Sequence, residues 1–263
     1  MTDFYGPLRL EIQARRRGRP LLFLLDYDGT LVEIAPRPEL ARPTPELLKL
    51  LIRLVAQRDL KVMVVSGRPL RDLQELLPVP GLNFLGSHGG EAYISGRLHP
   101  LQVAAADNEE LFRWRNRLGE SLQPFRGWWL EDKPFGFALH YRQVPAEHAD
   151  EFIGILGGWQ EQLRHEGRFQ LLAGKKVLEI LPHGVSKGAA IQKILLLPGF
   201  YGVFPIYLGD DITDESAFHI LQGQGLTIKV GRPGTETAAS HFLPDPEAVQ
   251  HFLALLAAPL EDY

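Results

Sequence analysis

The sequence predicts an α/β protein whose parallel sheet is interrupted by a smaller inserted α+β domain. Short apolar runs recur along the chain and end in polar residues, and amphipathic helical patterns separate them. Runs that are apolar on both faces are typical of strands buried on both sides of a parallel sheet. The alternation of strand and helix therefore indicates a doubly wound sheet, in which ligands bind beyond the carboxyl ends of the strands.

Five strands and two helices are expected in the α/β part. The apolar runs cover residues 21–25, 62–65, 82–85, 206–208 and 226–230. One helical pattern spans residues 44–58, with Thr44 as N-cap and Pro45 in the first turn. A second pattern spans residues 186–197, with Ser186 in the capping position. The closely spaced prolines between residues 36 and 45 predict a loop without helix.

The central stretch has a different order, helix–strand–strand, which occurs twice. The expected helices cover residues 108–122 and 146–165, and the expected strands cover residues 127–131, 136–142, 169–173 and 176–181. This order indicates a small antiparallel α+β domain. We expect it to be a cap domain at residues 101–182, inserted into a discontinuous α/β core at residues 1–100 and 183–263.

Composition excludes several classes of function. The 263 residues include no cysteine, which excludes disulfides, thiolate metal sites and cysteine nucleophiles. The net charge of -4 gives no general attraction to nucleic acid, and no apolar run is long enough to span a bilayer. The run Arg15-Arg16-Arg17 with Arg19 is interpreted as a solvated helix end rather than a polyanion site. We expect a cytoplasmic protein without nucleic-acid or membrane partners, and the sequence is compatible with a monomer.

Two carboxylates follow the first predicted strand, at Asp26 and Asp28, and Gly29 and Thr30 are expected to turn the chain there. One carboxylate can attack phosphorus directly and form an acyl-phosphate. A second carboxylate nearby can protonate the departing oxygen and then accept a proton from water. After the second strand, the hydroxyl of Ser66 and the neighbouring backbone N–H groups can bind phosphate oxygens.

The remaining chemistry-bearing residues follow later strands. Lys187 stands in the first turn of a predicted helix, where the helix dipole disfavours a cation unless an anion lies nearby; the alternative is a surface lysine. Asp210, Asp211, Asp214 and Glu215 follow the fourth strand. A hard divalent cation relieves the repulsion among such acids, and oxygen ligands favour Mg²⁺. The alternative is that Asp214 and Glu215 only stabilise a helix N-terminus.

These motifs, in this order, resemble the haloacid dehalogenase superfamily of phosphohydrolases and, in detail, the trehalose-6-phosphate phosphatase family. The resemblance rests on five segments, namely Asp26-Tyr27-Asp28-Gly29-Thr30-Leu31, Val65-Ser66-Gly67-Arg68-Pro69-Leu70, Gly86-Ser87-His88-Gly89-Gly90-Glu91, Val185-Ser186-Lys187-Gly188 and Gly209-Asp210-Asp211-Ile212-Thr213-Asp214-Glu215. It implies a haloacid-dehalogenase-type, Rossmann-like core with a parallel sheet, and it implies that the insertion is the family's α+β cap.

The resemblance also implies roles for individual residues. Asp26 is the expected nucleophile and Asp28 the expected general acid and base. The expected Mg²⁺ ligands are Asp26, the backbone carbonyl of Asp28, and Asp210, with either Asp211 or Asp214 in support. The residues expected to bind phosphate are Ser66, Gly67 and Lys187. The residues expected to contact the substrate are His88, Glu131, Lys133, Lys175 and Glu179.

The cap also carries residues that suit a sugar independently of the resemblance. Trp128 and Trp129 offer flat apolar faces, and His140 and Arg142 offer hydrogen bonds, although core packing is the favoured interpretation of both tryptophans. The sequence departs from the family where the family usually has an arginine, near Leu171-Leu172-Ala173, and again at Leu181-Pro182.

The expected activity is therefore Mg²⁺-dependent hydrolysis of a sugar phosphate, with trehalose 6-phosphate as the first candidate substrate. Asp26 would attack in line while Asp28 protonates the sugar oxygen, and water would then hydrolyse the phosphorylated aspartate. Other readings remain open: a phosphatase of the same superfamily for a glycosyl-glycerate phosphate or a hexose phosphate, a phosphomutase, or a non-catalytic sugar-phosphate sensor.

Overall fold

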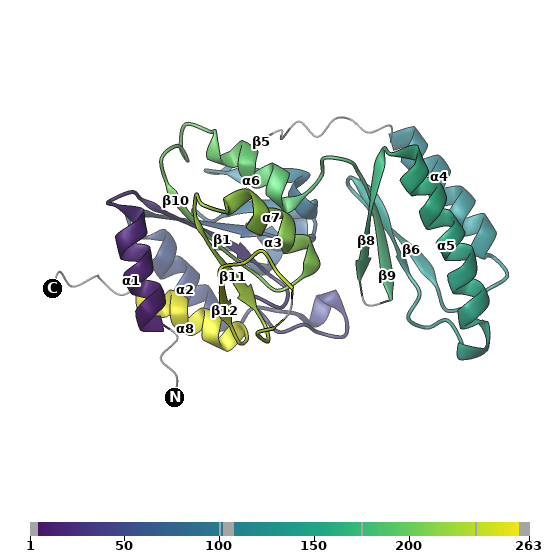
Figure 1. Ribbon diagram of the computed structural model, residues 1–263, viewed down its shortest axis with the longest axis horizontal. Helices are drawn as coiled ribbons and strands as arrows, with labels where there is room; N and C mark the ends of the chain where they lie inside the picture. The colour runs from purple at the N-terminus through teal and green to yellow at the C-terminus, as the bar shows by residue number, and fades with distance from the viewer. Residues whose placement is uncertain (1–4, 100, 102–107, 175, 235, 258–263) are drawn as a thin grey trace. The chain divides into compact units, whose positions relative to one another are not determined.

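The computed structural model describes residues 5–99, 101, 108–174, 176–234 and 236–257 (Figure 1). The chain divides into two compact units. The first, called the core below, comprises Met1–Leu101 and Ser186–Tyr263, and the second, called the cap, comprises Gln102–Val185. Each unit has its own sheet and its own cluster of buried apolar side chains. The architecture predicted from the sequence, an α/β core with an inserted α+β unit, is confirmed.

The core sheet has the strand order β12-β11-β10-β1-β2-β3-β4-β5. Its parallel strands are β1 (Leu21–Asp26), β2 (Leu60–Val65), β3 (Asn83–Gly86), β10 (Phe204–Gly209), β11 (Leu226–Val230) and β12 (His241–Leu243). The antiparallel edge consists of β4 (Glu91–Ile94) and β5 (Arg97–His99). The five predicted strands are present. The sequence analysis missed β4, β5 and β12, because runs of three or four residues leave no clear apolar pattern.

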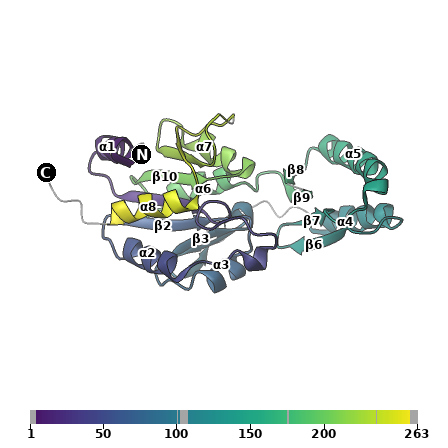
Figure 2. The same ribbon diagram turned by 90° about the horizontal axis from the view of Figure 1, so that it is seen from below.

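Helices cover both faces of this sheet. They are α1 (Tyr5–Arg16), α2 (Pro45–Val55), α3 (Leu70–Leu76), α6 (Lys187–Leu195), α7 (Glu215–Leu221) and α8 (Pro246–Ala257). Figure 2 shows α2 and α3 on one side of the sheet and α6 and α7 on the other. Successive residues of β1 alternate between these layers: Phe23 packs with α2 and α3, and Leu24 packs with α6 and α7. The sheet is thus buried on both faces, as its continuous apolar strands require.

Both predicted helix caps are present. The side chain of Thr44 accepts a hydrogen bond from the backbone N–H of Leu47, and that of Ser186 accepts one from Ala189. The predicted helix ends were two or three residues too late, since α2 ends at Val55 and α6 at Leu195. In the first case the chain must turn before β2 begins at residue 60. A single turn of 3₁₀ helix, Pro38–Leu40, occupies the proline-spaced loop that was predicted to lack helix.

The cap is a four-stranded antiparallel sheet in the order β6-β7-β9-β8, with two helices. Its elements are α4 (Asn108–Leu122), β6 (Trp129–Lys133), β7 (Gly136–His140), α5 (Ala149–Glu166), β8 (Phe169–Gly174) and β9 (Val177–Pro182). The observed β6 begins two residues later than predicted. Both helices pack on the same side of this sheet (Figure 1), around buried residues such as Phe137 and Leu139.

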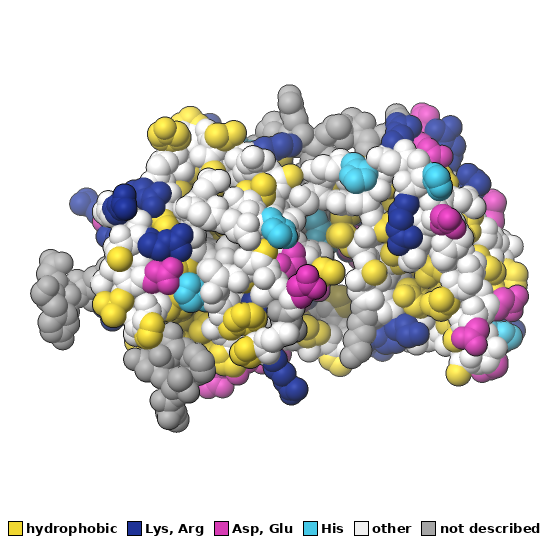
Figure 3. All heavy atoms as spheres, in the orientation of Figure 1, with side chains coloured by type: hydrophobic (Ala, Val, Ile, Leu, Met, Phe, Trp, Pro, Cys, Tyr) yellow, Lys and Arg dark blue, Asp and Glu magenta, His cyan; other side chains and the backbone are white. Residues whose placement is uncertain are grey.

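The basic residues at the end of α1 lie close together on the surface (Figure 3). Arg15 pairs with Glu11, and the Arg19 guanidinium donates to the backbone carbonyls of Arg15 and Arg16. Cations that bind the last carbonyls of a helix stabilise its C-terminus. These contacts agree with the interpretation as a helix end. Among the described helices, none has the length and apolar character needed to cross a membrane.

The packing of α2 gives a direct test of the core. Leu51 is fully buried, whereas its neighbour Ile52 is 51% exposed. We expect Leu51→Ala to lower the free energy of unfolding by about 2–5 kcal/mol, because it leaves a cavity against the sheet. Ile52→Ala, the matched control, should change it by no more than about 0.5 kcal/mol. Urea unfolding followed by circular dichroism measures both, and similar losses in the two variants would contradict the assigned face of α2.

Candidate active site

The candidate site lies at the carboxyl ends of three adjacent strands, β10, β1 and β2. Asp26 is the last residue of β1, Ser66 follows β2, and Asp210 follows β10. Because these strands are parallel neighbours, their carboxyl ends meet at one edge of the sheet. Residues from distant parts of the chain are thereby brought to one place.

A buried lysine connects two of the acids. Lys187 Nζ donates to Asp26 Oδ1 and to Asp214 Oδ1, each at 2.7 Å. Lys187 is only 3% exposed, so it is not the surface lysine that the sequence left as an alternative. Burial opposes its charge, but the charges of Asp214 and Asp26 outweigh burial and raise the pKa of Lys187. The lysine in the first turn of α6 is therefore a permanent cation that compensates neighbouring carboxylates.

The acids outnumber this cation. Carboxylate oxygens of Asp26, Asp210 and Asp214 lie within 4.8 Å of one another. Burial and the charges of Asp214 and Asp210 raise the pKa of Asp26 well above its ordinary value, although Lys187 opposes the shift. Burial and the charges of Asp214 and Asp211 likewise raise the pKa of Asp210 to about 6. A hard divalent cation with oxygen ligands would relieve this excess negative charge, so the cluster fits such an ion.

Both oxygens of Asp214 are already engaged. Oδ1 accepts from Lys187 and from the hydroxyl of Tyr207 at 2.6 Å, and Oδ2 accepts from the backbone N–H of Asp211 at 2.9 Å. Asp214 is fully buried, whereas Asp211 is exposed and caps the backbone N–H of Ile212. The structure thus brings Asp214, and not Asp211, next to Asp26. Sequence reasoning missed Tyr207, because a tyrosine inside an apolar strand reads as core.

Two glycines let the acids approach the backbone closely. Gly29 has φ of 84°, and a Cβ placed on it would lie 2.1 Å from Asp210 Oδ2. A Cβ on Gly209 would lie 2.3 Å from Asp214 Cγ. Larger residues at these two positions would displace the carboxylates. The backbone N–H of Gly29 donates to the carbonyl of Val32, so the chain does turn directly after Asp28, as predicted.

The carboxylate of Asp28 has a partner of its own. Arg68 holds it in a two-point ion pair, with Nε 2.7 Å from Oδ2 and Nη2 2.6 Å from Oδ1. The same guanidinium donates to the carbonyl of Pro38. Asp28 is thus close to the cluster in sequence, but its side chain lies against Arg68. The sequence analysis assigned no role to this arginine, although it directly follows the Ser66-Gly67 pair.

Ser66, Gly67 and His88 lie close together where β2 and β3 end, and the backbone N–H of His88 donates to the carbonyl of Ser66. Ser66 is 2% exposed, and its hydroxyl accepts from the backbone N–H of Arg68 at 3.1 Å. A Cβ on Gly67 would lie 2.4 Å from His88 Nε2, so the glycine provides the space that the imidazole occupies. His88 adopts a left-handed conformation with φ of 54°. The neighbouring Glu91 fixes this turn by accepting from Ser87 Oγ at 2.7 Å.

The predicted sugar contacts form a second group, within the cap sheet. Lys133 Nζ donates to Glu179 Oε1 at 3.0 Å, and His140 Nε2 lies 2.8 Å from Glu131 Oε2. The hydrogen bond with His140 lowers the pKa of Glu131, which therefore stays ionised. Lys175 lies outside the described residues. The structure brings together the other three charged residues predicted for this group.

The two tryptophans differ. Trp128 Nε1 donates to the carbonyls of Leu122 and Phe125, and its ring packs against the cap core. Trp129 is 52% exposed on the other side of the sheet. Core packing thus accounts for Trp128 and not for Trp129.

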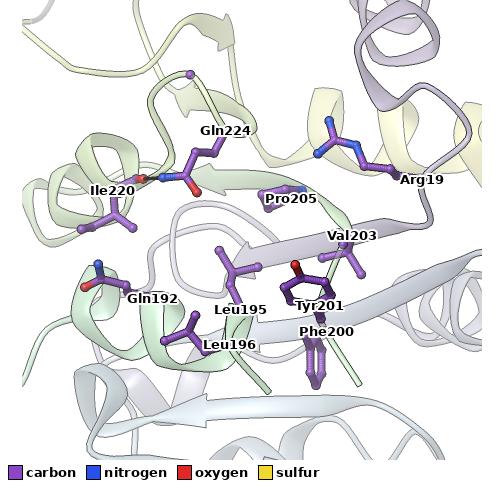
Figure 4. Close-up of a pocket in the computed structure, with 12 residues that line it drawn as sticks. Arg19, Gln192, Leu195, Leu196, Phe200, Tyr201, Val203, Pro205, Ile220 and Gln224 are labelled. Atoms are coloured by element: carbon purple, nitrogen blue, oxygen red, sulfur yellow. Dashed lines mark hydrogen bonds between the residues drawn. The ribbon is translucent and has the colours of Figure 1, made fainter. Parts of the chain in front are cut away.

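A cavity of about 560 Å³ lies away from these acids, at the opposite ends of the core strands (Figure 4). Arg19, which precedes β1, and Val203, which precedes β10, both line it, together with Tyr201 and Gln224. Its named lining residues include no carboxylate and no histidine. It therefore offers no group that could perform the chemistry expected from the sequence.

Comparison with known proteins agrees with this geometry. A family model described as trehalose-phosphatase matches residues 24–247. The chain belongs to the trehalose-phosphatase family. A trehalose 6-phosphate phosphatase of Zea mays is 35% identical and is matched over 93% of this chain and 72% of its own length. A trehalose-phosphate phosphatase of Mycobacterium marinum is 34% identical and is matched over 92% of this chain and 62% of its own length.

Another relative of this chain is much longer. An uncharacterized glycosyl hydrolase of Mycobacterium tuberculosis is 35% identical over 98% of this chain, but the chain spans only 19% of that protein. Among solved structures, the Aspergillus fumigatus trehalose-6-phosphate phosphatase has a TM-score of 0.70 and 26% identity, covering 95% of this chain and 97% of the other. The C-terminal domain of the C. albicans enzyme has a TM-score of 0.82 at 23% identity, with 96% and 98% covered, which shows the shared fold.

Removing the charge of Lys187 should destabilise the folded protein, because its two carboxylate partners stay buried. We expect Lys187→Met to lower the free energy of unfolding by about 3–5 kcal/mol in EDTA at pH 7.5, because Asp26 and Asp214 lose their cation while staying buried. Lys49→Met, an exposed position on α2, serves as the control and should have little effect. Urea unfolding measures both variants. Equal stability of the two would mean that the buried pairs contribute nothing.

Proposed function

We propose that this chain is a phosphatase that hydrolyses trehalose 6-phosphate to trehalose and phosphate, through a phosphorylated Asp26. The observation that carries the proposal is the buried carboxylate of Asp26, held by Lys187 at 2.7 Å beside the acids at the end of β10. Membership of the trehalose-phosphatase family and the names of its relatives from Zea mays and Mycobacterium support the substrate.

In the first step, an Asp26 carboxylate oxygen attacks phosphorus, and the bond from phosphorus to the sugar oxygen breaks. Lys187 fixes the orientation of the carboxylate through Oδ1. Orientation matters because in-line attack requires the attacking and leaving oxygens to lie on opposite sides of phosphorus. The Ser66 hydroxyl, the Gly67 backbone N–H and the Lys187 ammonium are the groups that we assign to the phosphate oxygens.

Asp28 is the group that we assign to proton transfer. After taking up a proton from solvent, it donates this proton to the departing sugar oxygen, and as a carboxylate it then takes a proton from the water that hydrolyses the phosphorylated aspartate. To reach the substrate, its carboxylate must leave the two-point ion pair with Arg68. Arg68 thereby keeps the Asp28 carboxylate away from the substrate, and breaking of the Arg68–Asp28 ion pair becomes one step of the catalytic cycle.

Mg²⁺ is the cofactor that we assign to this chain. The carboxylates of Asp26 and Asp210 and the backbone carbonyl of Asp28 would hold it, with Asp214 keeping Lys187 in place beside them. When bound, it supplies compensation of the charge repulsion between a carboxylate and a phosphoryl group. The excess of buried carboxylates over cations in the cluster supports the assignment.

Phosphate release from a panel of phosphates tests the reaction and the substrate together. We expect the wild type with Mg²⁺ to hydrolyse trehalose 6-phosphate with a kcat/KM at least about tenfold above that for glucose 6-phosphate or a glycosyl-glycerate phosphate. Asp26→Asn should reduce turnover of every substrate at least about a thousandfold, because an amide cannot form the acyl-phosphate.

Circular dichroism provides the folding control for Asp26→Asn. A well-folded Asp26→Asn variant with near wild-type activity would remove the nucleophile from this mechanism. Faster hydrolysis of another sugar phosphate would leave the mechanism in place and replace the substrate, and a sugar isomer as product would indicate a mutase.

Thermal unfolding tests the metal without relying on turnover. Mg²⁺ should raise the unfolding midpoint of the wild type at pH 7.5, because a ligand that binds only the folded state stabilises it. The rise should be smaller at pH 5, since protons compete for Asp210, whose pKa is about 6. Asp210→Asn should abolish the rise, and Asp211→Asn, an exposed neighbour, should keep it. An undiminished rise in Asp210→Asn would place the ion elsewhere.

A further inference from the structure

One face of the cap sheet carries an aromatic pair beside charged groups. Trp129 and His140 are directly opposite each other on β6 and β7. Their rings are parallel, with an interplanar angle of 3° and a centroid separation of 3.8 Å. Trp129 nevertheless remains 52% exposed. Since His140 covers one face of the indole, the exposed surface belongs to the side available to a ligand.

The alternation of the strands places this pair on the same face as the predicted sugar contacts. Trp129, Glu131 and Lys133 are separated by two residues each along β6, so their side chains share one face. The intervening Leu130 packs with the buried cap cluster beneath α4 and α5. The neighbouring strand β7 contributes Gly136, Ala138 and His140 to this face, because these residues pair with Lys133, Glu131 and Trp129. The small side chains of Gly136 and Ala138 therefore leave space between the aromatic pair and the charged groups on the neighbouring strands.

The chemistry of this face suits an uncharged ring with many hydroxyls. A flat indole packs well against the C–H face of a pyranose, and carboxylates accept hydrogen bonds from hydroxyls at its edge. Glu131 already has His140 as a partner and Glu179 has Lys133, so the acids are oriented before any ligand binds. The Glu131 carboxylate lies against the platform and disfavours a phosphate group there, which favours a ring that carries none.

We propose that Trp129 and His140 form a stacking platform for the unphosphorylated sugar ring, and that this platform selects disaccharide phosphates over monosaccharide phosphates. The inference rests on the proposed function and goes further, because it assigns the choice of substrate to an aromatic pair. Trp129 provides the stacking surface. His140 packs against one face of the indole and forms a hydrogen bond with Glu131 through its Nε2.

Three variants separate stacking from general damage to the cap. Trp129→Ala removes the platform, Trp129→Phe keeps a flat ring, and Phe112→Ala is the matched control, since Phe112 is 60% exposed on α4 at the other side of the sheet. We expect Trp129→Ala to lower kcat/KM for trehalose 6-phosphate about tenfold or more, mainly through KM. Trp129→Phe should stay within about threefold of the wild type, and Phe112→Ala within about twofold.

Two smaller substrates complete the experiment. Hydrolysis of glucose 6-phosphate and of an aryl phosphate should change less than about twofold in Trp129→Ala, because neither has a second sugar ring. An equal loss on glucose 6-phosphate, or no loss on trehalose 6-phosphate, would overturn the platform.

Inhibition by free trehalose keeps the inference testable even if the proposed substrate is wrong. With an aryl phosphate as reporter, trehalose should inhibit the wild type at least about tenfold more strongly than Trp129→Ala. A wild type that does not hydrolyse trehalose 6-phosphate would contradict the proposed function. Equal inhibition of the two proteins, or no inhibition of the wild type, would contradict the platform.

Discussion

The structure of the site depends on one buried cation, Lys187, shared by two buried carboxylates. Taking charges out of water is costly, and the cost is offset only where partners lie within hydrogen-bonding distance. Lys187 Nζ lies 2.7 Å from Asp26 Oδ1 and 2.7 Å from Asp214 Oδ1, and the Tyr207 hydroxyl also donates to Asp214. These contacts tie the end of β1, the start of α6 and the turn after β10 to one another, so the three segments cannot shift independently.

The close approach of these charges constrains the backbone around them. Gly29 and Gly209 leave space that the carboxylates of Asp210 and Asp214 fill. The cluster still holds more negative than positive charge, which burial makes more costly and which a divalent cation would relieve. The Asp26 carboxylate is therefore buried among groups whose negative charge exceeds the positive charge of Lys187.

The charged groups of the cap, like those of the core, are held in place by ion pairs. Its charged groups are paired within the sheet, as Lys133 with Glu179 and His140 with Glu131, so they are positioned before a ligand arrives. Preorganised groups lose less conformational entropy on binding. In the core and in the cap alike, charged side chains are thus held by partners of the same unit.

The sequence by itself determined the strand–helix alternation, the inserted α+β unit, the caps at Thr44 and Ser186, and the acids at the strand ends. These features depend on local patterns: apolar runs, capping residues and glycines that follow a strand. Only the tertiary structure decided that Lys187 is buried, that Asp214 rather than Asp211 joins the cluster, and that Arg68 holds Asp28. Such pairings join residues 27 to 161 positions apart, and no local pattern encodes which partner lies across the fold.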